Sequence, residues 1–163
     1  MSGKFPTTRI GDLELPRLVI GCNWVSGWSH RTPAKDNMIL ATHNNPESVS
    51  NIFKTFLNED INAVLGLFGI DHIDAVHMSE AATGKKMTIL DTVVINVDDN
   101  RAARKEAEEV IKESAKRGAK ICLPIHSCVE QLINKNKGTI DRLPDYLYMI
   151  RENGMIPGLS AHM

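Results

Sequence analysis

Apolar, strand-like segments recur along this chain at intervals of roughly 30 residues, and segments with helical periodicity separate them. A regular alternation of strands and amphipathic helices is typical of right-handed βαβ units, which build a parallel sheet. The expected strands are residues 15–24, 61–67, 87–97, 120–126 and 156–161. The sequence therefore predicts an α/β fold, and it places the C-terminal segment in a strand.

The helices are predicted from capping residues and from apolar positions spaced three or four apart. The expected helices are residues 36–43, a helix capped by Asn45 with Pro46 in its first turn, 71–82, a helix ending near 116, and 144–152. We expect Asp98 or Asp99 to cap the helix that ends near residue 116. His72 and His77 lie five positions apart on one predicted helix and are expected to be surface residues.

The architecture that fits this series best is a single domain, residues 1–163, made of about five units of an incomplete (β/α)8 (TIM) barrel. A whole barrel typically needs about 250 residues, and this chain has 163. The competing architecture is an open, doubly wound sheet. Such sheets often carry a glycine-rich phosphate loop after a strand, and no strand here is followed by one. We therefore expect the front half of a barrel, with a truncated reading frame as one explanation.

Composition and charge exclude several classes of protein. The formal net charge is −1, which gives no attraction to nucleic acid or to an anionic membrane. The longest apolar runs are far shorter than the ~20 residues that span a bilayer, and the N-terminus does not have the pattern of a signal peptide. Three cysteines without a CxxC motif fit reduced, buried thiols and a cytoplasmic location. Cys128 stays a candidate nucleophile because it follows a strand end beside His126.

The carboxyl ends of parallel strands carry the sites of βα proteins, and here several of these ends carry polar residues. His126 and His162 follow the fourth and fifth strands. Two imidazoles at neighbouring strand ends could bind a divalent metal, or act as acid and base on a carbonyl substrate. Asp98, after the third strand, could be the third metal ligand, although capping a helix would also explain it. The alternative for both histidines is a solvated position in a loop.

The loop after the first strand holds both tryptophans of the chain together with other polar residues. Asn23, Trp24, Trp28 and His30 are candidate substrate-binding residues, and Ser160 in the last strand joins them. The indole rings could form an apolar wall for a substrate or a subunit contact. They could equally fill the open end of a barrel.

The segment LPRLVIGCNW at residues 15–24 resembles the first strand of aldo-keto reductases, which are (β/α)8 barrels that use NADP. The N-W…S-H, L-P-x-H and G-L-S-x-H-M segments also resemble the front half of a group of bacterial barrel proteins of unassigned activity. The reductase family carries Asp and Tyr after its second strand and Lys after its third. Of that catalytic set, only its histidine has a counterpart here, His126.

Three functional hypotheses follow. The first is an enzyme acting on a small polar carbonyl or sugar-like metabolite, with metal-assisted isomerase, lyase or hydrolase chemistry as one form. The second, implied by the resemblance, is an oxidoreductase of the aldo-keto reductase type with an altered site; NADP contacts in that family come largely from later strands. The third is an inactive, truncated barrel fragment. We also expect exposed sheet edges at residues 17–23 and 156–161 to drive self-association or pairing with a missing C-terminal half.

Overall fold

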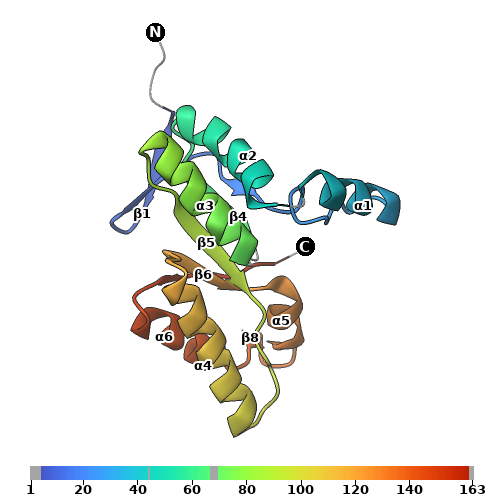
Figure 1. Ribbon diagram of the computed structural model, residues 1–163. Helices are drawn as coiled ribbons and strands as arrows, with labels where there is room; N and C mark the ends of the chain where they lie inside the picture. Colours follow the sequence, from blue (N-terminus) through green and yellow to red (C-terminus); the bar gives the residue numbers. More distant parts are fainter. Residues whose placement is uncertain (1–4, 44, 67–69, 162–163) are drawn as a thin grey trace. The chain divides into compact units, whose positions relative to one another are not determined.

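The computed structural model describes residues 5–43, 45–66 and 70–161 (Figure 1). Its main feature is a five-stranded parallel sheet with the order β3-β4-β5-β6-β9. These strands are β3 (Ile20–Gly21), β4 (Ala63–Gly66), β5 (Thr88–Val93), β6 (Ile121–Pro124) and β9 (Ile156–Pro157). The parallel α/β fold is thereby confirmed. The spatial order follows the chain order, and the described strands do not form a closed barrel.

Helices alternate with these strands. They are α1 (Pro33–Thr42), α2 (Pro46–Asn58), α3 (Ile70–Thr83), α4 (Arg101–Lys116), α5 (His126–Gln131) and α6 (Leu143–Glu152). Among the described residues, none of these helices is long and apolar enough to cross a membrane. The short helix α5 was not expected from the sequence.

Two caps illustrate what local sequence can and cannot specify. The side chain of Asn45 accepts a hydrogen bond from the backbone N–H of Ser48 at 2.9 Å, which confirms the predicted cap of α2. The expected cap of α4 by Asp98 or Asp99 is wrong. Asn100 takes that place, and its Oδ1 accepts from the N–H of Ala103 at 2.9 Å. The N–H of Asp98 instead donates to the side chain of Asn96, so Asp98 belongs to the turn that precedes the helix.

The described chain clusters into two compact units, a first unit ending at Thr88 and a second beginning at Ile89. In the first unit α2 and α3 pack side by side (Figure 1). Phe53 and Leu57 of α2 are completely buried, and they recur at the four-residue spacing that keeps side chains on one helix face.

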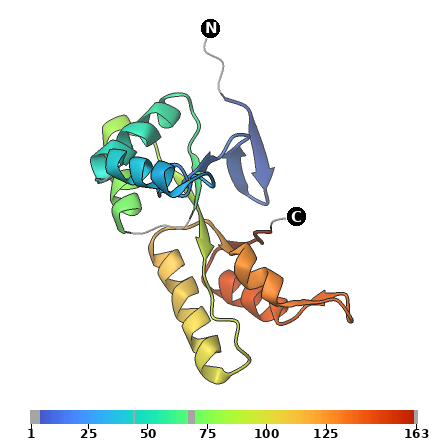
Figure 2. The same cartoon turned by 90° about the vertical axis from the view of Figure 1, so that its right-hand side faces the viewer.

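The second unit has its own core, in which α4 lies beside α6 (Figure 2). Ala103, Ala107 and Ile111 of α4 are fully buried, and the small alanines allow the helix to approach its neighbours closely. This core also holds a charged pair: the guanidinium Nη2 of Arg117 donates to the carboxylate of Asp91 at 2.6 Å.

The first predicted strand, residues 15–24, proves to be two different elements. An antiparallel hairpin joins β1 (Thr7–Ile10) to β2 (Leu13–Pro16), and Gly11 at the turn has a φ of 58°. The chain then bends and enters the parallel sheet only at β3. Proline has no N–H to donate, so Pro16 is suited to end a strand in the middle of this apolar run. The prediction of one continuous strand was wrong.

The last parallel strand is also shorter than the expected residues 156–161. Only Ile156–Pro157 is regular strand, although the N–H groups of Gly158 and Ser160 still donate to carbonyls of Cys122 and Pro124. Between α5 and α6 the chain forms a small hairpin of β7 (Ile133–Asn134) and β8 (Thr139–Ile140), which Figure 2 shows extending from the second unit.

Candidate functional site

Two of the predicted substrate-binding residues meet in the first unit, in the loop that follows β3. The side-chain amide of Asn23 lies 3.0 Å from the Nε2 atom of His30. Both residues are exposed, and the N–H of Trp28 donates to the carbonyl of Asn23, which closes the loop between them. An amide and an imidazole are therefore held together at the carboxyl end of the first parallel strand.

A second contact of this kind joins the same loop to α3. The hydroxyl of Ser26 lies 3.1 Å from the Nε2 atom of His72, which is in the first turn of α3, the helix after β4. β3 and β4 are neighbouring parallel strands, so both side chains belong to the same edge of the sheet. His72 was expected at the surface, and it is half-buried rather than fully exposed. His77 is exposed as expected.

A network around Ser29 holds the loop in shape. Ser29 is buried, and its backbone N–H and hydroxyl both donate to Oδ1 of Asp36, at 2.8 and 2.6 Å. These two hydrogen bonds lower the pKa of Asp36 from its ordinary value, so the carboxylate stays charged. His30, the next residue, has a φ of 54°, a left-handed conformation that a non-glycine residue adopts only when its surroundings require it.

The two tryptophans of the loop are both solvent-exposed in the structure. Trp24 is 54% exposed and Trp28 is 43% exposed, large fractions for indole rings. The ammonium of Lys35 lies 5.4 Å from the centroid of the Trp24 ring, within the range of a cation–π contact. The loop thus presents aromatic surface and two histidine contacts, and Lys35 of α1 lies beside one of its tryptophans.

The sites predicted in the second unit are only partly described. His126 is half-buried and begins α5, directly after β6 and Ile125. Asp98 is exposed, and its carbonyl accepts a hydrogen bond from Arg142 at 2.7 Å. Ser160 is half-buried, and its N–H donates to the carbonyl of Pro124 at 3.3 Å. His162 lies outside the described residues, so its pairing with His126 stays a prediction.

A metal centre was predicted from Asp98, His126 and His162. Within residues 5–43, 45–66 and 70–161, no group of three or more His, Cys, Asp or Glu side chains could hold a metal ion. That search does not include His162, and the proposed ligand set needs it.

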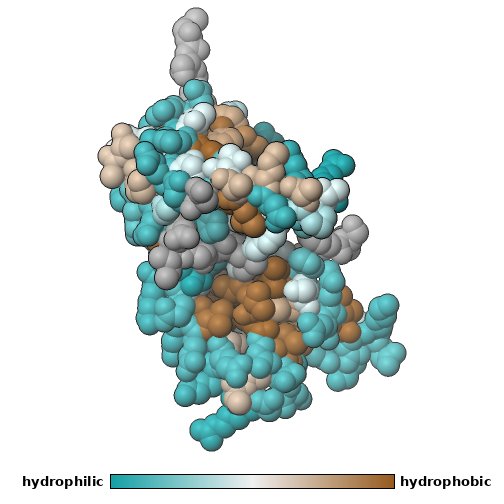
Figure 3. Space-filling model, turned by 45° about the vertical axis from the view of Figure 1, so that its right-hand side comes forward, coloured by the Kyte–Doolittle hydropathy of each residue, from teal (hydrophilic) through white to brown (hydrophobic). Residues whose placement is uncertain are grey.

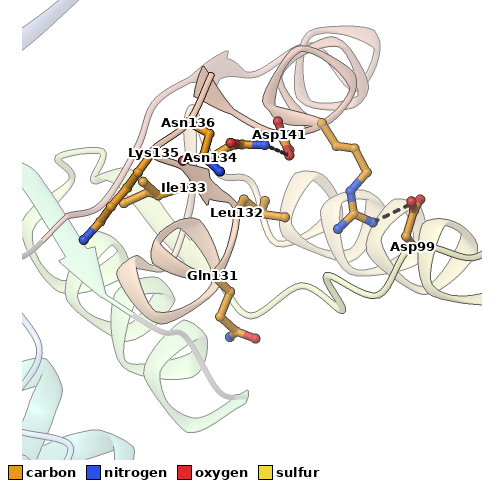
Figure 4. Close-up of a pocket in the computed structure, with 9 residues that line it drawn as sticks. Asp99, Gln131, Leu132, Ile133, Asn134, Lys135, Asn136 and Asp141 are labelled. Atoms are coloured by element: carbon orange, nitrogen blue, oxygen red, sulfur yellow. Dashed lines mark hydrogen bonds and ion pairs between the residues drawn. The ribbon is translucent and has the colours of Figure 1, made fainter. Parts of the chain in front are cut away.

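The second unit contains a pocket of about 690 Å³ (Figure 4). It is lined by residues that follow β5 and β6: Asp99, Gln131, Leu132, Ile133, Asn134, Lys135, Asn136, Asp141 and Arg142. Several polar side chains of this lining form hydrogen bonds within the β7–β8 hairpin. Asp141 accepts from the amide of Asn134 at 2.9 Å and from the hydroxyl of Thr139 at 3.0 Å, and these bonds lower its pKa.

Arg142 connects the segment after β5 to the residues just before α6. Its guanidinium donates to the carbonyls of Val97 and Asp98, and it lies 3.7 Å from the carboxylate of Asp99. Its φ of 58° is left-handed, at the residue that precedes α6. The loop after β5 is therefore tied to the start of α6, and we assign Arg142 a structural role.

The three cysteines are free thiols and all are buried, as expected. The thiol of Cys128 is 3.3 Å from the carbonyl of Ile95 and is 3% exposed as a residue, which does not favour a role as nucleophile. Burial raises the pKa of the Cys122 thiol to about 11, so this thiol is protonated at neutral pH.

Comparison with family models found none that matches the chain, and no curated protein or solved structure matches it significantly. The resemblance to aldo-keto reductases therefore depends on residues 15–24 and on His126.

Proposed function

We propose that this chain belongs to an enzyme that acts on a small polar carbonyl or sugar-like metabolite by general acid–base catalysis. The site is the loop after β3 together with the start of α3. The observation that carries the proposal is that two side chains of this loop each contact an imidazole. The Asn23 amide lies 3.0 Å from Nε2 of His30, and the Ser26 hydroxyl lies 3.1 Å from Nε2 of His72. Histidine is the side chain most often used to transfer protons near neutral pH.

The residue types suit a carbonyl substrate. A neutral imidazole can remove a proton from the carbon next to a carbonyl, and the amide of Asn23 can donate a hydrogen bond to the oxygen on which charge develops. Trp24 and Trp28 would cover the apolar side of the substrate, and Lys35 beside Trp24 would favour an acidic one.

We further propose that the parallel sheet is part of a (β/α)8-type barrel. In support, the order β3-β4-β5-β6-β9 follows the chain without a reversal, as in a barrel. A doubly wound sheet reverses its strand order at the point where its ligand binds. Barrel sites lie at the carboxyl ends of strands, where the Ser26–His72 contact is found.

Hydrogen–deuterium exchange in substrates tests the function. The protein is incubated in D2O with a panel of small aldoses, ketoses, keto acids and lactones, and deuterium uptake next to the carbonyl is followed by NMR. We expect at least one compound to exchange above the buffer rate, and the variant H72Q to slow that exchange about 100-fold. The matched control is H77A, an exposed histidine on the same helix. No exchange above buffer, or equal slowing by both variants, would contradict the proposal.

A metal site formed by Asp98, His126 and His162 is a second candidate. Its support is the 3.3 Å hydrogen bond from Ser160 to Pro124, which brings the C-terminal segment beside the end of β6, two residues before His126. Titration calorimetry with Zn²⁺ should then show one site, which H126A weakens and H77A does not. An absence of binding, or the same affinity in both variants, would remove this candidate.

A further inference from the structure

We propose that Ser26 is a nucleophile activated by His72, and that the substrates of this site are lactones or esters of small polar acids. This inference rests on the proposed function, because it uses the same loop and narrows its carbonyl substrates to acyl compounds. The contact between the Ser26 hydroxyl and His72 Nε2, at 3.1 Å, has the length expected of a nucleophile and its general base.

The position of Ser26 fits such a role better than that of the other hydroxyls in its loop. The Ser29 hydroxyl is buried and donates to Asp36, which keeps it away from a substrate. Ser26 is half-buried, at the carboxyl end of β3, and its backbone is fixed by a hydrogen bond from its N–H to the Cys22 carbonyl at 2.9 Å. Its backbone is thus fixed by the fold, and the residue as a whole is only half-buried.

The base comes from a second element at the same edge. His72 lies in the first turn of α3, so the backbone of this helix holds its imidazole beside the loop that carries Ser26. A neutral ring is the form that can accept the serine proton. The exposed rings of Trp24 and Trp28 lie in the same loop as Ser26 and offer contact surface for the rest of an acyl substrate.

The reaction balances with water alone. The Ser26 proton passes to His72 while Oγ bonds to the acyl carbon; the carbon–oxygen bond of the ester breaks, and the departing alcohol takes the proton from His72. Water then attacks the acyl-serine and gives a proton to His72. The acyl–Oγ bond breaks, and Ser26 recovers its proton. The net reaction is hydrolysis of an ester or lactone to the acid and the alcohol.

Labelling with an alkyl fluorophosphonate tests the inference directly, because a nucleophilic serine displaces fluoride and forms a stable adduct. We expect one adduct by intact mass, mapped by peptide sequencing to Ser26. S26A should abolish the adduct, and S127A, at an exposed serine, should not change it. H72A should slow labelling about 100-fold relative to H77A.

The rate of labelling in the unaltered protein gives a readout that needs no variant. It should rise as an imidazole loses its proton between about pH 5 and pH 8. An absent adduct, an adduct at another residue, a rate that does not change over this range, or equal rates for H72A and H77A would overturn the inference. Deuterium exchange without labelling would support the proposed function and exclude Ser26 as a nucleophile. Labelling without deuterium exchange would support the nucleophile and contradict the proposed acid–base function.

Discussion

At the scale of single residues, the two side-chain contacts of the site differ in how far apart their partners lie along the chain. Asn23 and His30 are seven positions apart, in one loop after a strand, so local order was enough to group them. Ser26 and His72 are 46 positions apart, and their contact depends on β3 and β4 being neighbours. His72 lies at the start of the helix that follows the second predicted strand. A histidine just after a parallel strand was the signal that could have identified it as a site residue.

The buried pair of Asp91 and Arg117 provides a test of stability at this scale. The Asp91 side chain is 1% exposed, and removal of its cation would leave a carboxylate uncompensated in the core. We expect R117M to lower the free energy of unfolding by about 2–3 kcal/mol, somewhat less than for a fully buried pair because Arg117 is 30% exposed. Urea unfolding measures it. K116M, which removes an exposed pair with Glu113, should lower the free energy of unfolding far less, and equal losses would contradict the assignment.

Cys122 gives a prediction about pH. Burial raises its pKa from 9.0 to about 11, with the hydrogen bond to Ser114 partly opposing the rise. Above pH 9 the unfolded chain loses this proton while the folded chain keeps it, so stability should fall as pH rises from 9 to 11. The two-unit difference sets an upper limit of about 2.7 kcal/mol.

Urea unfolding at pH 8 and pH 10.5 measures this loss, with C122A as the comparison. The loss between the two pH values should be smaller in C122A, because other titrating groups are shared by both proteins. The same pH dependence in both would show that Cys122 does not contribute to it.

At the scale of elements, the helices were predicted better than the strands. Caps such as Asn45 followed by Pro46 act within one turn, so the sequence shows them directly. Strand limits depend on which neighbour each backbone group meets. The apolar run from Leu15 was therefore predicted as one strand, although Pro16 ends β2 and the chain bends before Ile20. For the same reason neither strand of the β7–β8 hairpin was predicted from the sequence.

The corrected cap of α4 leads to a prediction at this scale. N100A should lower the free energy of unfolding by about 1 kcal/mol, because the N–H of Ala103 loses its acceptor. D98A should change it by less than about 0.5 kcal/mol, since Asp98 is exposed and precedes the cap. Thermal or urea unfolding separates the two. A larger loss in D98A would restore the original assignment.

At the scale of the whole molecule, the predicted self-association has weaker support from the sheet edges than the sequence suggested. β3 and β9, the outer strands of the sheet, have two residues each, and short edge strands offer little backbone for pairing. Apolar side chains nevertheless gather on one face of the second unit (Figure 3). Leu123 of β6 is half-buried on the sheet face opposite Asp91 and Cys122, and Val94 beyond β5 is 57% exposed.

We therefore propose that any self-association uses this face of the sheet more than its edges. Sedimentation velocity at micromolar concentration should show a dimer, and V94E should shift it toward the monomer because a charge would be buried in the contact. L18E, at an exposed leucine next to the edge strand β3, is the matched control. A monomer at all concentrations would contradict the prediction, as would a dimer that only L18E disrupts.

The central claim is that the ends of β3 and β4 bring Ser26 and His72 into contact, and long-range ¹H–¹⁵N NMR of the imidazole rings tests it most directly. S26A should change the ¹⁵N shifts and the tautomer of His72 while those of His77 stay the same. If the ¹⁵N shifts of the His72 ring do not respond to S26A, the contact between Ser26 and His72 does not form.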